Sequence, residues 1–74
     1  MEYKYANKEE KTIKVIIEPI FDEYYLEKKE VLVIKTDDDI PIDIDIDESD
    51  LDLVVLTLDS HFFYKTEIIK VIQD

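Results

Sequence analysis

The segment Ile40–Ile46 constrains the fold more than any other part of this sequence. Isoleucine occupies every second position, and the positions between hold Pro41, Asp43 and Asp45. Side chains of a β-strand alternate between its two faces, so this pattern places the isoleucines on one face and the carboxylates on the other. We therefore expect a half-buried strand whose acidic face continues to Asp47. Pro41 lacks a backbone donor, which favours a position at the edge of the sheet.

Other segments also predict strands, because they are rich in β-branched and aromatic residues with alternating or continuous apolar patterns. Val31–Lys35 is apolar on both faces, which is typical of a central strand. The further predicted strands are Glu2–Ala6, Thr12–Glu18 and Leu51–Leu58, with polar turns at Asn7–Lys11, Asp37–Asp39, Asp47–Asp50 and Asp59–Ser60.

Two segments leave helix and strand open. Ile20–Glu30 follows a proline and runs from acids to lysines, the order that suits a helix dipole. As a strand, Phe21–Leu26 would instead pair with Val31–Lys35 across a turn. His61–Ile72 is the second such segment, and its tyrosine, phenylalanine, threonine and isoleucines favour a strand. That strand would place Phe62, Tyr64, Thr66, Ile68 and Ile72 on one side, whereas a helix would align Phe62, Ile69 and Ile72.

Together these elements predict a mostly β fold, a small antiparallel meander curled into a barrel or sandwich, with room for one short helix. The alternative is an α+β fold in which one or two helices cover one face of an antiparallel sheet. Leu, Ile, Val and Phe make up about 36 % of the 74 residues. That share lies well above the roughly 20 % below which charged chains stay disordered. We therefore expect one small acidic domain over residues 1–74.

The charge is distributed very unevenly. Thr36–Ser60 holds ten acids and no lysine, whereas the other 49 residues hold ten acids and nine lysines. Nearly all of the net charge of −11 therefore lies in one block. A field of one sign over this length favours a basic partner. The candidate partner-binding residues are Asp37, Asp38, Asp39, Asp43, Asp45, Asp47, Glu48, Asp50 and Asp52.

On a strand, Asp43, Asp45 and Asp47 would form a row with about 6.6–6.8 Å between neighbours, since each residue rises about 3.3–3.4 Å. This spacing is close to that of successive phosphates in a nucleic-acid strand. In composition, size and charge layout the chain resembles the nucleic-acid-mimicking inhibitors that phages and mobile elements use for counter-defence. The resemblance implies a non-enzymatic inhibitor that occupies the basic groove of a nucleic-acid-binding protein. It carries over no residue roles.

Several functions are disfavoured by what the sequence lacks. Without Cys or Gly there is no thiol nucleophile, cysteine-bound metal or glycine-rich phosphate loop. Asp43, Asp45 and Asp47 match the start of a calcium loop, but Glu48 replaces its glycine and Val54 its final glutamate. His61 suits a strand end near water better than a ligand. We expect no enzyme activity, no cofactor and no metal site.

The expected partners follow from the same charge. An acidic chain without Arg should bind neither nucleic acid nor anionic membranes directly, and we expect it in the cytoplasm. The alternative to the mimic is an immunity-like, antitoxin-like or accessory-subunit interaction module. A second alternative is a structural homo-oligomer, such as a homodimer, whose acids serve solubility and protect a strand edge. Tyr24 with Tyr25 and Phe62 with Phe63 are adjacent aromatic residues, so on a strand one member of each pair faces away from the other. We expect both sheet faces to be covered there; the alternative is that one aromatic residue is exposed as a docking anchor or a dimer contact.

Overall fold

The computed structural model describes residues 1–37, 42–48, 50, 52–58 and 64–71. The regular secondary structure of these residues consists of strands. They contain no helix, and therefore none that is long and apolar enough to span a membrane. The strands are β1 (Glu2–Ala6), β2 (Ile13–Glu18), β3 (Asp22–Leu26), β4 (Glu30–Lys35), β5 (Ile44–Asp47), β6 (Leu53–Leu58) and β7 (Lys65–Lys70).

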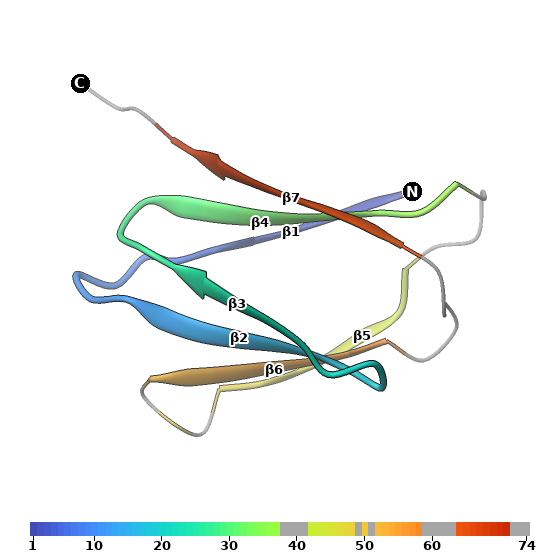
Figure 1. The fold of residues 1–74 in the computed structure, drawn as a ribbon, viewed down its shortest axis with the longest axis horizontal. Helices are drawn as coiled ribbons and strands as arrows, with labels where there is room; N and C mark the ends of the chain where they lie inside the picture. The colour runs from blue at the N-terminus through green and yellow to red at the C-terminus, as the bar shows by residue number, and fades with distance from the viewer. Residues whose placement is uncertain (38–41, 49, 51, 59–63, 72–74) are drawn as a thin grey trace.

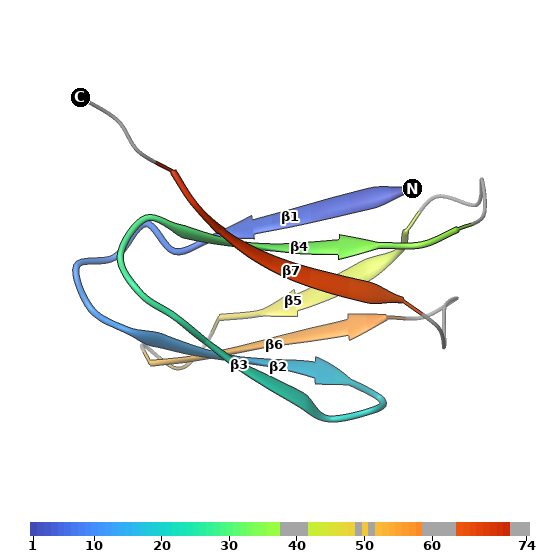
Figure 2. The same ribbon diagram turned by 45° about the horizontal axis from the view of Figure 1, so that its top comes forward.

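The strands form two sheets that pack face to face as a sandwich (Figures 1 and 2). Sheet A has the order β1-β4-β7, and sheet B has the order β3-β2-β6-β5. Every strand pair is antiparallel except β2 and β6, which run parallel with Val15 opposite Val54. The described strands of the two sheets do not pair with each other, so no barrel is closed.

The core lies between the sheets because each strand turns one set of alternate side chains inward. In β2 the inward residues are buried while those between them are half-buried, and β6 repeats the pattern. β4 is the central strand of sheet A and is buried on both faces, as its continuous apolar run predicts. The buried cluster consists of Ile13, Val15, Ile17, Leu26, Leu32, Ile34, Val54, Leu56 and Leu58.

The mostly β prediction is confirmed, and the sandwich is the form it takes. Of the two interpretations of Ile20–Glu30, the strand is confirmed over Asp22–Leu26, where β3 lies, and the helix is wrong. The alternative pairing of this strand with Val31–Lys35 is wrong too, because β3 pairs with β2. A simple meander also fails to describe sheet B, whose centre is the parallel pair of β2 and β6.

The C-terminal segment forms a strand rather than a helix over the residues that the structure describes. β7 covers Lys65–Lys70 and pairs with β4. Tyr64, Thr66 and Ile68 lie on one side, as the strand interpretation predicts. The other two residues of that predicted face, Phe62 and Ile72, lie outside the described residues, as do His61 and Phe63.

Asn7 is a buried polar residue that links three segments. Its side-chain amide donates hydrogen bonds to the carbonyls of Lys11 and Leu26, both at 2.8 Å. Its side-chain oxygen accepts a bond from the backbone N–H of Glu9 at 2.9 Å. Its backbone N–H donates to Glu30 at 2.9 Å. Asn7 thus fixes the turn after β1 against the end of β3 and the start of β4.

Two turns adopt left-handed backbone geometry without glycine. Phe21 has φ 65° in the turn between β2 and β3, which also contains a cis peptide bond before Pro19. Lys29 has φ 68° in the turn between β3 and β4. The turn at Lys29 carries the chain from sheet B to sheet A, which is why β3 and β4 are not partners in one hairpin.

A candidate acidic binding face

The acidic row lies at the outer edge of sheet B. β5 is an edge strand that pairs with β6 alone among the described strands. Asp45 lies opposite Thr57 and Asp47 opposite Val55, which places both carboxylates on the outer face, away from the core. Asp43 precedes β5 and is exposed as well. The alternation has this result because Ile44 packs against the core from the opposite face of the strand.

The other predicted residues do not all continue this row. Asp37 is exposed but follows β4, a strand of sheet A, while β5 belongs to sheet B. Asp38 and Asp39 lie outside the described residues.

Beyond β5, the three remaining acids of the predicted set have partners within the molecule. Tyr5 Oη donates a hydrogen bond of 3.3 Å to Glu48 Oε1. Asp50 Oδ1 accepts the backbone N–H of Asp52 at 3.1 Å, and Asp52 forms an ion pair with Lys11. The exposed acids on β5 and just before it are Asp43, Asp45 and Asp47.

The hydrogen bond between Tyr5 and Glu48 affects the pKa of Tyr5. Partial burial, followed by the charge of Glu48 and the hydrogen bond to it, raises the pKa of Tyr5 to about 12. Burial and the Glu48 charge also raise the pKa of Tyr3. Glu48 is thus turned toward β1 and the space between the sheets rather than toward the row.

Most of the lysine ion pairs among the described residues are with acids outside the acidic block Thr36–Ser60. Lys14 pairs with Glu23 at 3.3 Å and Lys35 pairs with Glu67 at 3.3 Å. Lys28 pairs with Glu10 at 2.7 Å, which lowers the pKa of that carboxyl. Of these lysine pairs, Lys11 with Asp52 is the one that draws on the acidic block. The ion pairs of Lys14, Lys28 and Lys35 therefore neutralise acids outside the acidic block.

An apolar strip borders the row on the outer face of sheet B. Val55 lies opposite Asp47 on one side and opposite Ile16 on the other, and both apolar residues are half-buried. Tyr25, on β3, is 60 % exposed, so the expectation that both sheet faces are covered is wrong there. Lys14 lies 6.0 Å from the centre of the Tyr25 ring. Tyr24 faces inward and bonds to Thr66.

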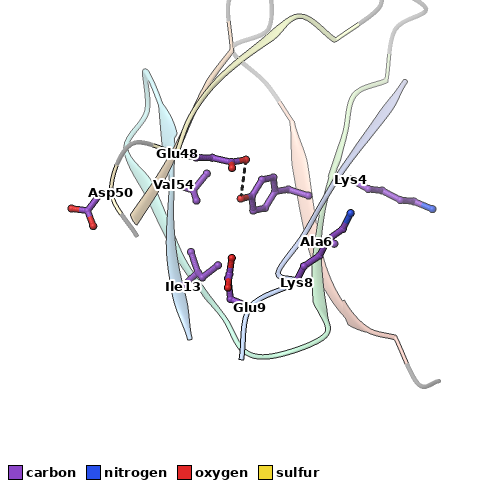
Figure 3. A pocket seen from close by; sticks show the side chains of 9 residues that line it. Lys4, Ala6, Lys8, Glu9, Ile13, Glu48, Asp50 and Val54 are labelled. Carbon is purple, nitrogen blue, oxygen red and sulfur yellow. Dashed lines mark hydrogen bonds between the residues drawn. The ribbon is translucent and has the colours of Figure 1, made fainter. Parts of the chain in front are cut away.

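A hollow of about 600 Å³ opens on the side of the sandwich between β1 and the turn after β5 (Figure 3). Ile13 and Val54 contribute apolar side chains, and Glu9, Glu48 and Asp50 contribute carboxylates. The sequence gives no signal for this hollow, because its lining comes from segments that are far apart in the chain.

No group of three or more ligating side chains that could hold a metal ion is found among the described residues. Comparison with models of protein families, with curated proteins and with solved structures finds no match for this chain. The surface features of the described residues that bear on function are the acidic row, the apolar strip and the hollow.

Proposed function

We propose that this protein is a non-enzymatic inhibitor or binding protein that presents the row of Asp43, Asp45 and Asp47 to a basic, nucleic-acid-binding protein. The observation that carries the proposal is the exposure of Asp45 and Asp47 on the edge strand β5 and of Asp43 just before it. The ion pairs of Lys14, Lys28 and Lys35 are with acids outside the acidic block. Such a row offers a basic groove the charge that nucleic-acid phosphates would offer.

The proposal extends to the setting in which such a protein acts. Its size and charge layout fit the counter-defence inhibitors of phages and mobile elements, which would place it in the cytoplasm of the host cell. A net charge of −11 steers it toward basic surfaces and away from nucleic acid and anionic membranes. Its binding should weaken steeply as salt rises, because exposed charges are screened.

The test compares two triple variants with equal changes in charge. The first changes Asp43, Asp45 and Asp47 to Asn. The control changes three acids that pair with lysines outside the block, Glu10, Glu23 and Glu67, to Gln. Each immobilised protein is incubated with cell lysate at low salt, and captured proteins are identified by mass spectrometry and purified.

We expect the wild type and the control to capture the same nucleic-acid-processing protein, and duplex DNA or RNA to displace it. We expect the row variant to bind it at least roughly tenfold more weakly, because charge complementarity is lost. Equal binding by the row variant would refute the proposal. In that case the acids serve to protect an exposed strand edge, and the row variant should instead self-associate in light scattering.

The apolar strip with Tyr25 supports a second candidate, an interaction module of the immunity or antitoxin kind. Apolar residues flanked by charge are typical of protein–protein interfaces, where Tyr is enriched. Such a module would bind a basic partner without excluding nucleic acid from it. Competition separates the two functions, since DNA or RNA displaces a mimic but leaves the module bound. Tyr25→Ser should weaken the module more than the mimic.

A further inference from the structure

The two long sides of the sandwich differ in how they are closed. On one side, β3 and β7 are joined by a 2.9 Å contact between the Tyr24 and Thr66 hydroxyls, and by a 2.5 Å bond from Tyr64 Oη to Asp22. On the other side, β1 and β5 flank the hollow, and the hydrogen bond from Tyr5 to Glu48 crosses it (Figure 3). This second side is the open one.

β1 presents unpaired backbone groups on the open side. Met1 and Thr36 exchange both backbone hydrogen bonds, and the Asn7 N–H donates to Glu30. In an antiparallel pair, bonded and non-bonded residue pairs alternate, so the backbone groups of residues 1, 3, 5 and 7 face β4. Those of Glu2, Lys4 and Ala6 therefore point away from β4, where sheet A has no further strand among the described residues.

The hollow adjoins this free edge and has the lining that an added strand would need. Lys4 and Lys8 also contribute to the lining. Figure 3 shows the Lys4 ammonium and the Asp50 carboxylate both pointing away from the hollow, so Glu9 and Glu48 are the acids nearest to it.

Ile46 gives a second sign that this side lacks a cover. Its side chain shares the inward face of β5 with Ile44, yet it is 45 % exposed. An apolar side chain on the core face of an edge strand is expected to be covered by the opposite sheet. Here the opposite sheet ends at β1.

We propose that the free edge of β1 accepts an extended segment of the basic partner as an additional strand, with apolar residues in the hollow and basic residues at its acidic rim. The partner's basic character rests on the proposed function, but the edge itself does not. In this mode of recognition, backbone hydrogen bonds supply affinity and side-chain pockets supply specificity. The added strand would extend sheet A and close the open side.

A second copy of this chain fits the edge less well. A two-fold arrangement that uses all three free residues of β1 sets Lys4 directly opposite the Lys4 of the copy, and like charges in that position are destabilising. Each copy also carries a net charge of −11. A basic segment meets neither obstacle.

The probe is a fluorescent peptide of about nine residues with alternating Lys and Val, long enough to span a typical strand. One control peptide replaces each Lys with Glu, and another carries Pro at its centre, where it cannot complete the ladder. Anisotropy reports binding, and hydrogen exchange reports the amides of Glu2, Lys4 and Ala6. We expect only the Lys/Val peptide to bind and to slow exchange at these three amides.

Two proline variants test the edge itself. Ala6→Pro removes an outward N–H of β1 that β4 does not use. Lys70→Pro is the matched control on the outer edge of β7. The Val71 N–H donates to the Lys29 carbonyl, on the β4 side of β7, so the N–H of the preceding Lys70 points away from β4. We expect Ala6→Pro to weaken peptide binding roughly tenfold, since an incoming carbonyl loses its donor, and Lys70→Pro to leave it unchanged.

The outcomes separate this inference from the proposed function. Undiminished peptide binding by a folded Ala6→Pro variant overturns the inference. Unchanged hydrogen exchange at the amides of Glu2, Lys4 and Ala6 in the wild-type protein with the Lys/Val peptide also overturns it, and this measurement requires no variant. A dimer joined through β1 in light scattering also overturns it, because the edge then holds a second copy. If the row variant loses the cellular partner but keeps the peptide, both proposals stand. If it keeps both, the proposed function fails alone.

Discussion

Replacing Asn7 tests whether one buried side chain holds the turn after β1 to the rest of the fold. Asn7→Ala removes three hydrogen bonds, those to the carbonyls of Lys11 and Leu26 and that from the Glu9 N–H. The residue is 2 % exposed, so water cannot readily replace these partners. Each lost bond costs about 0.5–1.5 kcal/mol, and more where a buried group stays unpaired. We expect a loss of roughly 2–4 kcal/mol in the free energy of unfolding.

That loss is large for this chain. At about 0.05–0.15 kcal/mol per residue, a domain of this length has roughly 4–11 kcal/mol in total. Urea unfolding followed by Tyr fluorescence and far-UV circular dichroism measures the change. With a slope near about 1 kcal/mol/M, the midpoint should fall by roughly 2 M or more. Lys8→Ala, in the same turn but exposed, is the control and should change stability by less than about 0.5 kcal/mol.

Asn7→Asp sharpens the same test, because it keeps the shape and the acceptor but removes both donors. The new carboxylate would face the carbonyls of Lys11 and Leu26, so its pKa should rise in the folded state. The folded state then binds the proton more tightly than the unfolded one, and stability relative to wild type falls as pH rises through that interval. A loss below about 1 kcal/mol for Asn7→Ala, with no pH-dependent deficit for Asn7→Asp, would refute the argument.

Three further predictions concern the contacts that join the sheets and turns. The pKa of Tyr5 is raised to about 12 in the folded protein, so stability should decline between about pH 10 and pH 12, and Tyr5→Phe should remove that part of the decline in urea titrations. Tyr64→Phe removes the bond to Asp22, which should cost about 1 kcal/mol and lower the thermal midpoint, while an unchanged midpoint would contradict a stabilising role. Lys29→Gly relieves left-handed strain of about 1 kcal/mol but adds backbone entropy to the unfolded state, so calorimetry should show equal or slightly higher stability, and a clear loss would mean that the turn is not strained.

The sequence predicts strands well here because the pattern of each strand is local. The alternation of β5 places Ile44 toward the core and Asp45 outward, and the continuous apolar run of β4 marks it as central. Periodicity, however, says which face a residue takes and not which strand lies beside it. The inner faces of β2 and β6 carry interchangeable aliphatic residues, so nothing in their pattern shows that these two strands pair with each other.

The wrong pairing of β3 has a specific cause. A short connection favours a hairpin, and the turn before β4 is short. The left-handed geometry at Lys29 and the bond from its N–H to the Asn7 carbonyl at 3.2 Å lead the chain into the other sheet instead. The sequence does not indicate that Lys29 and Asn7 direct the chain into the other sheet. Glycine is the usual residue at a left-handed position, and asparagine is common in any turn.

The candidate site divides in the same way. The row of Asp43, Asp45 and Asp47 follows from local alternation. The diversion of Glu48 to Tyr5 and of Asp52 to Lys11 depends on segments about forty residues away, which only the folded topology brings together. The hollow belongs to that second category, since it exists because two sheets end beside each other.

The parallel pairing of β2 with β6 has a consequence for how this chain reaches its native state. Of the strand pairs, only β2 with β3 and β5 with β6 join neighbours in the sequence. Sheet A draws on β1, β4 and β7, so it is not complete until β7 is available. Closing such long loops costs chain entropy before stabilising contacts form, so folding is slow, on a scale of milliseconds to seconds. During synthesis the two hairpins can form before β7 is made, whereas the edge of β4 that β7 covers stays open until β7 has left the ribosome.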